Sequence, residues 1–171
     1  TILGTVTITG EVFFFQNPHL ISIYFLGSSL AIEGSNTFYR CQITSVGFGN
    51  KQVATVFNDK YTNHGNITSV TLGKGGADFT PDVFSDYTGL TSVTLHSDTA
   101  VAKFQTIFTN RLSYINNVTI GDSVTKIGFE AFKKCNQIQY VTFADTVKTI
   151  GNSSFSHCTS LKNVLVPASV T

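Results

Sequence analysis

Methionine and tryptophan are absent from this chain of 171 residues, and charged side chains account for only 12 % of it. The 11 basic and 10 acidic residues nearly cancel, so the sequence lacks the excess of positive charge that nucleic-acid binding requires. Long apolar runs are lacking too, since the run at residues 12–15 is far shorter than a membrane span or a signal-peptide core. We therefore expect no nucleic-acid partner and no membrane insertion by this chain. Because it begins at Thr1 without a methionine, we expect it to be part of a longer protein.

Aromatic and hydroxyl side chains dominate what is present. Phenylalanine occurs 15 times, and apolar residues make up 42 % of the chain, which is enough for a sizeable core. Threonine, serine and asparagine are abundant, whereas the strong helix formers are few. This composition favours strands and turns over long helices.

A repeat is plain in the last third of the chain. The segment INNVTIGDSVTKIGFEAFKKCNQ begins at Ile115, and IQYVTFADTVKTIGNSSFSHCTS follows it from Ile138. Both place three apolar residues, a Val, an Ile-Gly pair, a Phe and a Cys at the same spacings. A further copy, LKNVLVPASVT, starts at Leu161.

The same frame extends back through the chain. Repeats begin at Leu20, Ile43, Ile67, Leu90, Ile115, Ile138 and Leu161. Their spacings lie within the ~20–29 residues of a leucine-rich repeat. We therefore expect one solenoid over residues 1–171, with a degenerate or clipped repeat at 1–19, six full repeats at 20–160 and a truncated repeat at 161–171. In the first of these, the spacing of Leu3, Val6 and Ile8 predicts the strand half of a repeat.

Each repeat is expected to supply one short strand that pairs in parallel with its neighbours, about 4.8 Å away. Two apolar columns should then lie beneath the sheet: Ile23, Val46, Val70, Val93, Val118, Val141, Val164, and Phe25, Phe48, Leu72, Leu95, Ile120, Phe143, Val166. An aromatic column should fill the return side: Phe38, Tyr61, Phe84, Phe108, Phe132 and Phe155. The predicted fold is an α/β-type, strand-rich leucine-rich repeat solenoid of about seven repeats. Its parallel sheet forms one face, and short turns or single helical turns form the other.

The frame of Val, Ile-Gly, Phe and Cys resembles the BspA-like leucine-rich repeats of bacterial and parasitic-protist surface proteins. VTKIGFEAFKKC and VKTIGNSSFSHC carry the resemblance over residues 115–171. Over residues 20–114 the spacing persists but other pairs replace Ile-Gly: Val56-Phe57, Phe79-Thr80 and Phe104-Gln105. The geometry of the return side is therefore open in that part. The resemblance implies a cell-surface or secreted protein that adheres to host, matrix or microbial partners.

Cysteine and histidine offer no catalytic arrangement. Cys41, Cys135 and Cys158 share one repeat position beside the aromatic column, where equivalent side chains point in parallel and oppose a disulfide. We interpret them as small buried apolar residues. His64 replaces the cysteine of its repeat and is expected to pack in the core, while His157 and Cys158 are neighbours that should point apart. We assign no catalytic residue and predict that the chain is not an enzyme.

Asp78, Asp82 and Asp86 recur every four residues, which invites a calcium interpretation, but the ligand spacing and closing Glu of an EF-hand are missing. We interpret them as solvent-exposed aspartates of a turn that cap a helix. The glycine-rich segment at residues 73–78 lacks the full phosphate-loop pattern and is interpreted as a turn. The sequence predicts no metal and no cofactor.

Three Asn-x-Ser/Thr sequons, at Asn66, Asn117 and Asn152, are candidate glycosylation sites in a secretory route. Asn117 lies on the expected outward face of a strand, where a glycan would obstruct that face.

The outward side chains of the strands form a neutral, hydroxyl-rich surface. The candidate contacts on it are Tyr24, Ser69, Thr71, Ser92, Thr94, Thr119, Tyr140 and Thr142. Repeat proteins bind partners through such extended faces, and tyrosine is a frequent interface anchor. Serine and threonine also suit the surface of any sheet, so a purely structural role stays open for each of them.

Two functions fit these features. We favour an extracellular or cell-surface adhesion and recognition module that binds a protein or glycan ligand through the solenoid face. The alternative is a structural or assembly protein whose solenoids pack end to end, or decorate a filament or cell wall. Residues 3–8 and 161–171 both resemble interior repeats and not polar caps, so self-association through uncapped ends is also expected.

Overall fold

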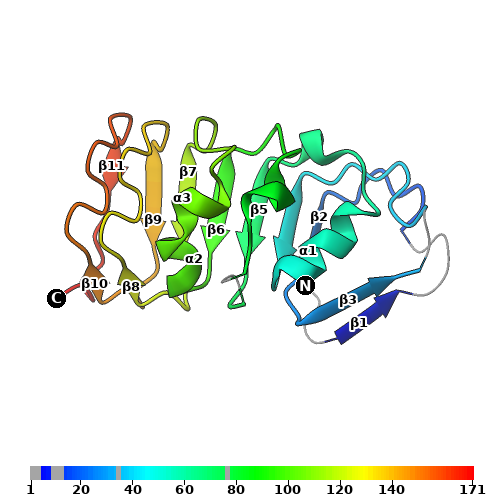
Figure 1. Ribbon diagram of the computed structural model, residues 1–171, viewed down its shortest axis with the longest axis horizontal. Helices are drawn as coiled ribbons and strands as arrows, with labels where there is room; N and C mark the ends of the chain where they lie inside the picture. The colour runs from blue at the N-terminus through cyan, green and yellow to red at the C-terminus, as the bar shows by residue number, and fades with distance from the viewer. Residues whose placement is uncertain (1–4, 9–13, 34–35, 76–77) are drawn as a thin grey trace.

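The computed structural model describes residues 5–8, 14–33, 36–75 and 78–171. Its largest element is a parallel sheet with one strand from each repeat (Figure 1). The strands lie side by side in the order of the chain: β2 (Ser22–Phe25), β4 (Ser45–Phe48), β5 (Ser69–Leu72), β6 (Ser92–Leu95), β7 (Asn117–Ile120), β9 (Tyr140–Phe143) and β11 (Asn163–Val164). Every repeat start from Leu20 onwards is therefore followed by a strand of this sheet.

The strands pair without any stagger. Ser45 lies opposite Ser69, Ser69 opposite Ser92, and Ser92 opposite Asn117. Because side chains alternate along a strand, this register sends equivalent residues of all repeats to the same side. The two predicted columns are buried as far as β9 apart from Phe143, which is half-buried.

The prediction of burial is wrong at the last strand. Val164 and Val166 were expected to continue the columns, but 39 % and 53 % of their surfaces are exposed. The reason is that β11 pairs with β9 on one side and has no strand on its other side among the described residues. Inward-facing side chains of a solenoid are covered only when both neighbouring repeats are present.

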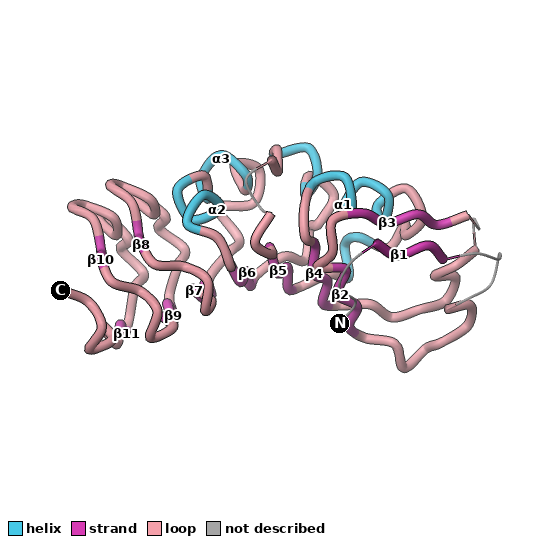
Figure 2. The backbone as a smooth tube through the Cα atoms, turned by 90° about the horizontal axis from the view of Figure 1, so that it is seen from below, coloured by secondary structure: helices cyan, strands magenta, loops and turns pink. Residues whose placement is uncertain are grey.

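The opposite side of the solenoid changes character along its length, as Figure 2 shows. At the N-terminal end it is a two-stranded parallel sheet of β1 (Thr5–Ile8) and β3 (Ser29–Ile32), and at the C-terminal end a second one of β8 (Lys126–Ile127) and β10 (Thr149–Ile150). Helical segments lie between them: α1 (Lys51–Asn58), η1 (His64–Asn66), η2 (Pro81–Phe84), α2 (Asp98–Ala102) and α3 (Phe104–Ile107). The three repeats in which Val56-Phe57, Phe79-Thr80 and Phe104-Gln105 replace Ile-Gly are the ones that carry these helical segments.

The first strand corrects one expectation. The spacing of Val6 and Ile8 was interpreted as the main-sheet half of a repeat, but β1 pairs with β3 in the second layer, with Ile8 opposite Ile32. Leu3 lies outside the described residues. An alternation of apolar residues occurs in both halves of a repeat, so the pattern alone could not distinguish them. Residues 5–8 and 14–17 therefore correspond to the return half of a repeat.

The loop after β1 supports this correction. The Phe14 ring stacks on Phe38 of the next repeat at a centroid distance of 5.5 Å. Four residues that each follow a column aromatic by two positions share a left-handed φ of 54° to 61°: Gln16, Arg40, Lys134 and His157. A left-handed φ is uncommon for residues other than glycine. Its recurrence shows that these four loops have the same backbone turn.

The aromatic column is denser than expected, and all of its members are buried except Phe155, which is half-buried. Phe84 stacks on Phe108 with centroids 5.2 Å apart, and Phe132 stacks on Phe155 at 5.0 Å. Phe104 of α3 adds a ring beside Phe132, at 4.8 Å. Offset and tilted ring pairs of this kind are favourable beyond the area they bury.

Helix α1 supplies another ring through local sequence signals. Asn50 precedes the helix with an extended backbone, and its side-chain oxygen accepts a hydrogen bond from Val53 N at 3.0 Å, as an N-cap does. The helix buries Val53, Ala54 and Phe57. The Phe57 ring lies 5.6 Å from that of Phe48 in β4, so the helix packs directly on the main sheet.

Candidate binding surface

The strand face predicted from the sequence exists as two continuous rows. In the in-step register, one row consists of Ser22, Ser45, Ser69, Ser92, Asn117, Tyr140 and Asn163. The other consists of Tyr24, Gly47, Thr71, Thr94, Thr119 and Thr142. Neither row contains a charged side chain, so the face offers hydroxyl, amide and aromatic groups for contact.

Tyr24 is fixed on this face by its neighbours. Its hydroxyl makes a 2.8 Å hydrogen bond with the Ser45 hydroxyl. Its ring lies over Gly47, where an added Cβ would come within 2.4 Å of the ring atom Cδ1. Only glycine at position 47 leaves room for the ring, so Tyr24 presents a fixed aromatic edge at the N-terminal end of the face.

The predicted contacts differ in how much of each a partner could reach. Tyr140 and Thr142 are exposed, whereas Tyr24, Ser69, Ser92, Thr94 and Thr119 are half-buried. Thr71 departs from the expectation, because only 9 % of its surface is exposed. It pairs with Gly47, which is itself buried beneath the Tyr24 ring, so the face is closed in at this point. Thr71 is therefore a packing residue and offers almost no surface to a ligand.

Tyr140 is the most prominent side chain of the two rows, with 45 % of its surface exposed. The Lys162 Nζ atom lies 5.4 Å from the ring centroid and 3.5 Å from the hydroxyl oxygen. This places a cation within cation–π distance of an aromatic ring near the C-terminal end of the face.

The sequons lie in different surroundings. Asn66 ends the short helix η1 and Asn152 lies in a turn, and both are exposed. Asn117 is half-buried in β7, paired with Ser92 on one side and Tyr140 on the other. The structure brings none of the three together with another.

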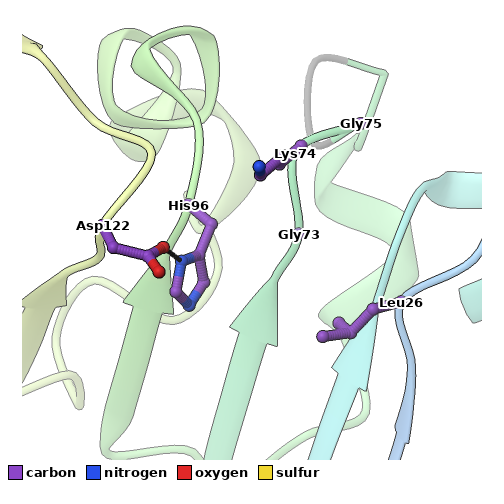
Figure 3. Close-up of a pocket in the computed structure, with 6 residues that line it drawn as sticks. All are labelled: Leu26, Gly73, Lys74, Gly75, His96 and Asp122. Carbon is purple, nitrogen blue, oxygen red and sulfur yellow. Dashed lines mark hydrogen bonds and ion pairs between the residues drawn. The ribbon is translucent and has the colours of Figure 1, made fainter. Parts of the chain in front are cut away.

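A second feature lies where the main-sheet strands end. A pocket of about 300 Å³ is lined by Leu26, Gly73, Lys74, Gly75, His96 and Asp122 (Figure 3). Leu26 directly follows β2 and His96 directly follows β6, while Lys74 and Asp122 come two residues after β5 and β7. Parallel strands bring their carboxyl ends to one edge, which is how residues so far apart in sequence meet.

His96 and Asp122 form a pair across two repeats. Nδ1 of the imidazole lies 2.8 Å from Oδ1 of the carboxylate. The hydrogen bond and the charge of His96 lower the pKa of the Asp122 carboxyl, and the charge of Lys74 adds to this. A Cβ on Gly121 would come within 2.4 Å of His96 Nδ1, so glycine at that position leaves room for the pair.

Sequence reasoning did not find this group. His96 was one of four scattered histidines, and residues 73–78 were interpreted only as a turn. The repeat frame contained the signal, because Leu26, Lys74, His96 and Asp122 all occupy the first or second position after a strand of the main sheet. A comparison of these two positions across the repeats would have identified the four residues.

The other polar candidates have structural partners. Asp78 Oδ1 accepts a hydrogen bond from the backbone N–H of Lys51 at 3.1 Å. Asp82 accepts one from the Thr80 hydroxyl and lies 3.9 Å from Lys51 Nζ. Asp86 is exposed. Within the part of the chain that the structure describes, no three metal-ligating side chains gather at one place.

The cysteines are buried and unbridged, in accord with the interpretation from the sequence. Cys41 and Cys158 point their thiols at backbone carbonyls of the preceding repeat, Phe14 O and Phe132 O, both at 3.0 Å. Burial raises the pKa of the Cys135 thiol to about 12, with a contribution from Cys158. A thiol with a raised pKa is a poor nucleophile and metal ligand.

The two histidines singled out in the sequence lie in different surroundings. His64 stacks on Tyr87 at a centroid distance of 5.4 Å, and burial lowers the pKa of its imidazole. His157 is exposed and its Nδ1 lies 2.8 Å from the Ser156 hydroxyl oxygen, while the Cys158 thiol points at Phe132 O.

A comparison with models of known protein families identifies the family of this chain. The family model described as "BspA type Leucine rich repeat region (6 copies)" matches residues 1–110 and 104–171. The chain belongs to the BspA-type leucine-rich repeat family. No curated protein and no solved structure matches it significantly.

Membership of the BspA-type family carries general properties. Leucine-rich repeats of this type are often found in surface or secreted proteins, and the repeat is generally a protein-interaction fold, not an enzymatic one. No helix in the described part of this BspA-type chain has the length and apolar character to cross a membrane.

Proposed function

We propose that this chain is an extracellular or cell-surface adhesion and recognition module, in which residues 1–171 form one solenoid. It binds a host, matrix or microbial protein or glycan through the two strand rows. The observation that carries the proposal is the continuous, charge-free face with Tyr24 and Tyr140 at its two ends. Such a face resembles the centre of an interface, where charge is scarce and aromatic residues are enriched.

A panel of immobilised matrix proteins, cell surfaces and glycans tests this proposal. We expect saturable binding to at least one member, weakened at least fivefold by Tyr140→Ser. The matched control is Tyr114→Ser, because Tyr114 is 55 % exposed but lies in a loop outside the strand rows. Absence of binding across the panel, or equal losses in the two variants, would contradict the proposal.

The alternative, a structural or assembly protein, is favoured by one observation. Val164 at the end of β11 and the two residues after it, Leu165 and Val166, are exposed, and Leu165 is 85 % exposed. An apolar open edge of this kind can pair with another chain. Sedimentation of the purified chain over a range of concentrations distinguishes the two functions, because end-to-end packing predicts species that grow with concentration.

A further inference from the structure

The pocket at the carboxyl ends of the strands offers a definite set of polar groups. Lys74 contributes an ammonium with three donors. His96 Nδ1 faces Asp122, so Nε2 is the ring nitrogen that is left for a ligand. Asp122 uses Oδ1 in its hydrogen bonds with His96 and Ser123, and Oδ2 is a second acceptor. The pocket therefore combines a lysine ammonium with an imidazole nitrogen and a carboxylate oxygen that can both form hydrogen bonds.

The apolar part of the pocket is kept open by glycine. A Cβ on Gly73 would lie 3.6 Å from Leu26 Cδ2 and 3.3 Å from the backbone of the neighbouring repeat at Gly49. A side chain there would fill the space beside Leu26. A Cβ on Gly75 would approach Gly49 O within 2.5 Å. Leu26 thus faces an open hollow, with the His96–Asp122 pair and Lys74 on its other side (Figure 3).

The charge balance narrows the class of ligand. Lys74 and Asp122 offset each other, so a multiply charged anion such as phosphate gains from the lysine but is repelled by the carboxylate. A ligand with a single carboxylate can place it on Lys74, while its hydroxyl groups form hydrogen bonds with His96 Nε2 and Asp122 Oδ2. The C–H surface of the same ligand can then lie against Leu26. A hydroxylated carboxylic acid meets all of these conditions.

We propose that this pocket binds a sugar acid, meaning one uronic-acid-like unit of an acidic glycan. Its volume of about 300 Å³ is at the small end for ligand pockets and suits a single monosaccharide. The inference rests on the proposed recognition function and adds to it a ligand site that is separate from the strand rows. A single unit in so open a site binds weakly, at millimolar concentrations, and many copies on a surface provide the avidity that adhesion requires.

Amide chemical shifts of the ¹⁵N-labelled chain, followed during titration, test the assignment. The probes are D-glucuronate, D-glucose as the neutral sugar, and acetate as the bare carboxylate, at matched ionic strength. We expect D-glucuronate to shift the amides of Gly73, Gly75, His96 and Asp122 saturably, and the other two probes to bind at least fivefold more weakly. Lys74→Gln should weaken D-glucuronate binding at least fivefold, and Lys148→Gln, a change at an exposed lysine outside the pocket, should leave it unchanged.

Each contrary result overturns the assignment. Acetate binding as tightly as D-glucuronate would show a simple anion site, and glucose binding as tightly would show that Lys74 is not used. Shifts confined to other residues, or no saturable shift, would remove the site. His96→Gln is a second variant, and its dispersed amide spectrum would establish that the fold is intact before its affinity is compared.

The test of the pocket can fail independently of the test of the proposed function. Tyr140 lies on the strand face and does not line the pocket, so Tyr140→Ser should not alter D-glucuronate binding. A chain that adheres to a panel member but ignores D-glucuronate refutes the pocket assignment alone.

Discussion

Several glycines of this solenoid are required by the side chain of a neighbouring repeat. Gly47 accommodates the Tyr24 ring, and Gly121 accommodates the His96 imidazole. In both cases the glycine and the side chain that needs the space belong to different repeats. The residue pattern within one repeat therefore cannot reveal the requirement. The sequence alone did not indicate which glycines are sterically needed.

Adding one methyl group at Gly121 tests this steric requirement. Gly121→Ala should lower the free energy of unfolding by about 1–3 kcal/mol, because the new Cβ would lie 2.4 Å from His96 Nδ1 and force the pair apart. Gly128→Ala is the matched control, since no atom lies within 4 Å of its added Cβ. That change should stay within about 0.5 kcal/mol. Urea denaturation measures both, and equal values would refute the steric argument.

The helices of the middle repeats were only partly predictable. Single helical turns were expected, whereas α1 has eight residues and α2 and α3 follow each other almost directly. Capping signals were present, because Asn50 and Ser97 each accept a hydrogen bond from a backbone N–H three residues later. Helix length depends on packing, and Phe57 and Phe104 face the core only once the helices have formed. The loss of Ile-Gly marked where the return side would change, but not into what.

Helix α1 is held mainly by one ring. Phe57→Ala should cost about 3–5 kcal/mol, since the buried Phe57 ring contacts Phe25, Phe38 and Phe48. Phe129→Ala removes a ring that is 68 % exposed and should change stability by less than about 0.5 kcal/mol. Thermal or urea unfolding compares the two, and a small loss for Phe57→Ala would show that α1 is dispensable.

The start of α2 is tied to β8 through a carboxylate. Asp98 accepts hydrogen bonds from Thr125 N and Oγ1, both at 2.7 Å, and from Lys126 N at 3.0 Å. Partial burial opposes ionisation, but these bonds together with the charge of Lys126 lower the pKa of the Asp98 carboxyl. A carboxyl with a lowered pKa in the folded state stabilises the fold above its unfolded pKa of about 3.9. That contribution is lost as the pH falls through the folded value.

Asp98→Asn should therefore be less stable than the unmodified chain at pH 7, by a modest amount because the site is exposed to solvent. The difference should shrink at acid pH, as the pH falls below the unfolded pKa of about 3.9 and through the lowered folded pKa of the Asp98 carboxyl. Free energies of unfolding at the two pH values give the comparison. A difference that is independent of pH would show that the charge of Asp98 is not involved.

At the scale of the whole molecule, the repeat spacing predicted the parallel sheet, its register and the buried columns as far as β9. It failed at both ends. Val6 and Ile8 matched the strand half because both halves of a repeat alternate, and Val164 and Val166 matched the columns although β11 has only one neighbouring strand. The alternation of apolar residues predicts which side of the strand a residue faces. Whether that residue is buried also depends on the presence of the adjoining repeat.

The exposed edge makes a prediction about association. Leu165→Lys combined with Val166→Lys places charge on the open edge and should reduce any concentration-dependent self-association of the chain. Analytical ultracentrifugation of both forms gives the measurement. If the unmodified chain associates and the double variant associates equally, the contact lies elsewhere on the surface.

The register without stagger has a consequence for how such chains can change in length. Since Ser45, Ser69 and Ser92 stand opposite one another, the strand register of the main sheet is the same at these junctions. Deleting or duplicating one whole unit in the gene therefore rejoins strands in a matching register, whereas removing part of a unit would turn the following strand out of step. The encoded array can be shortened or extended by recombination while the main sheet keeps its register.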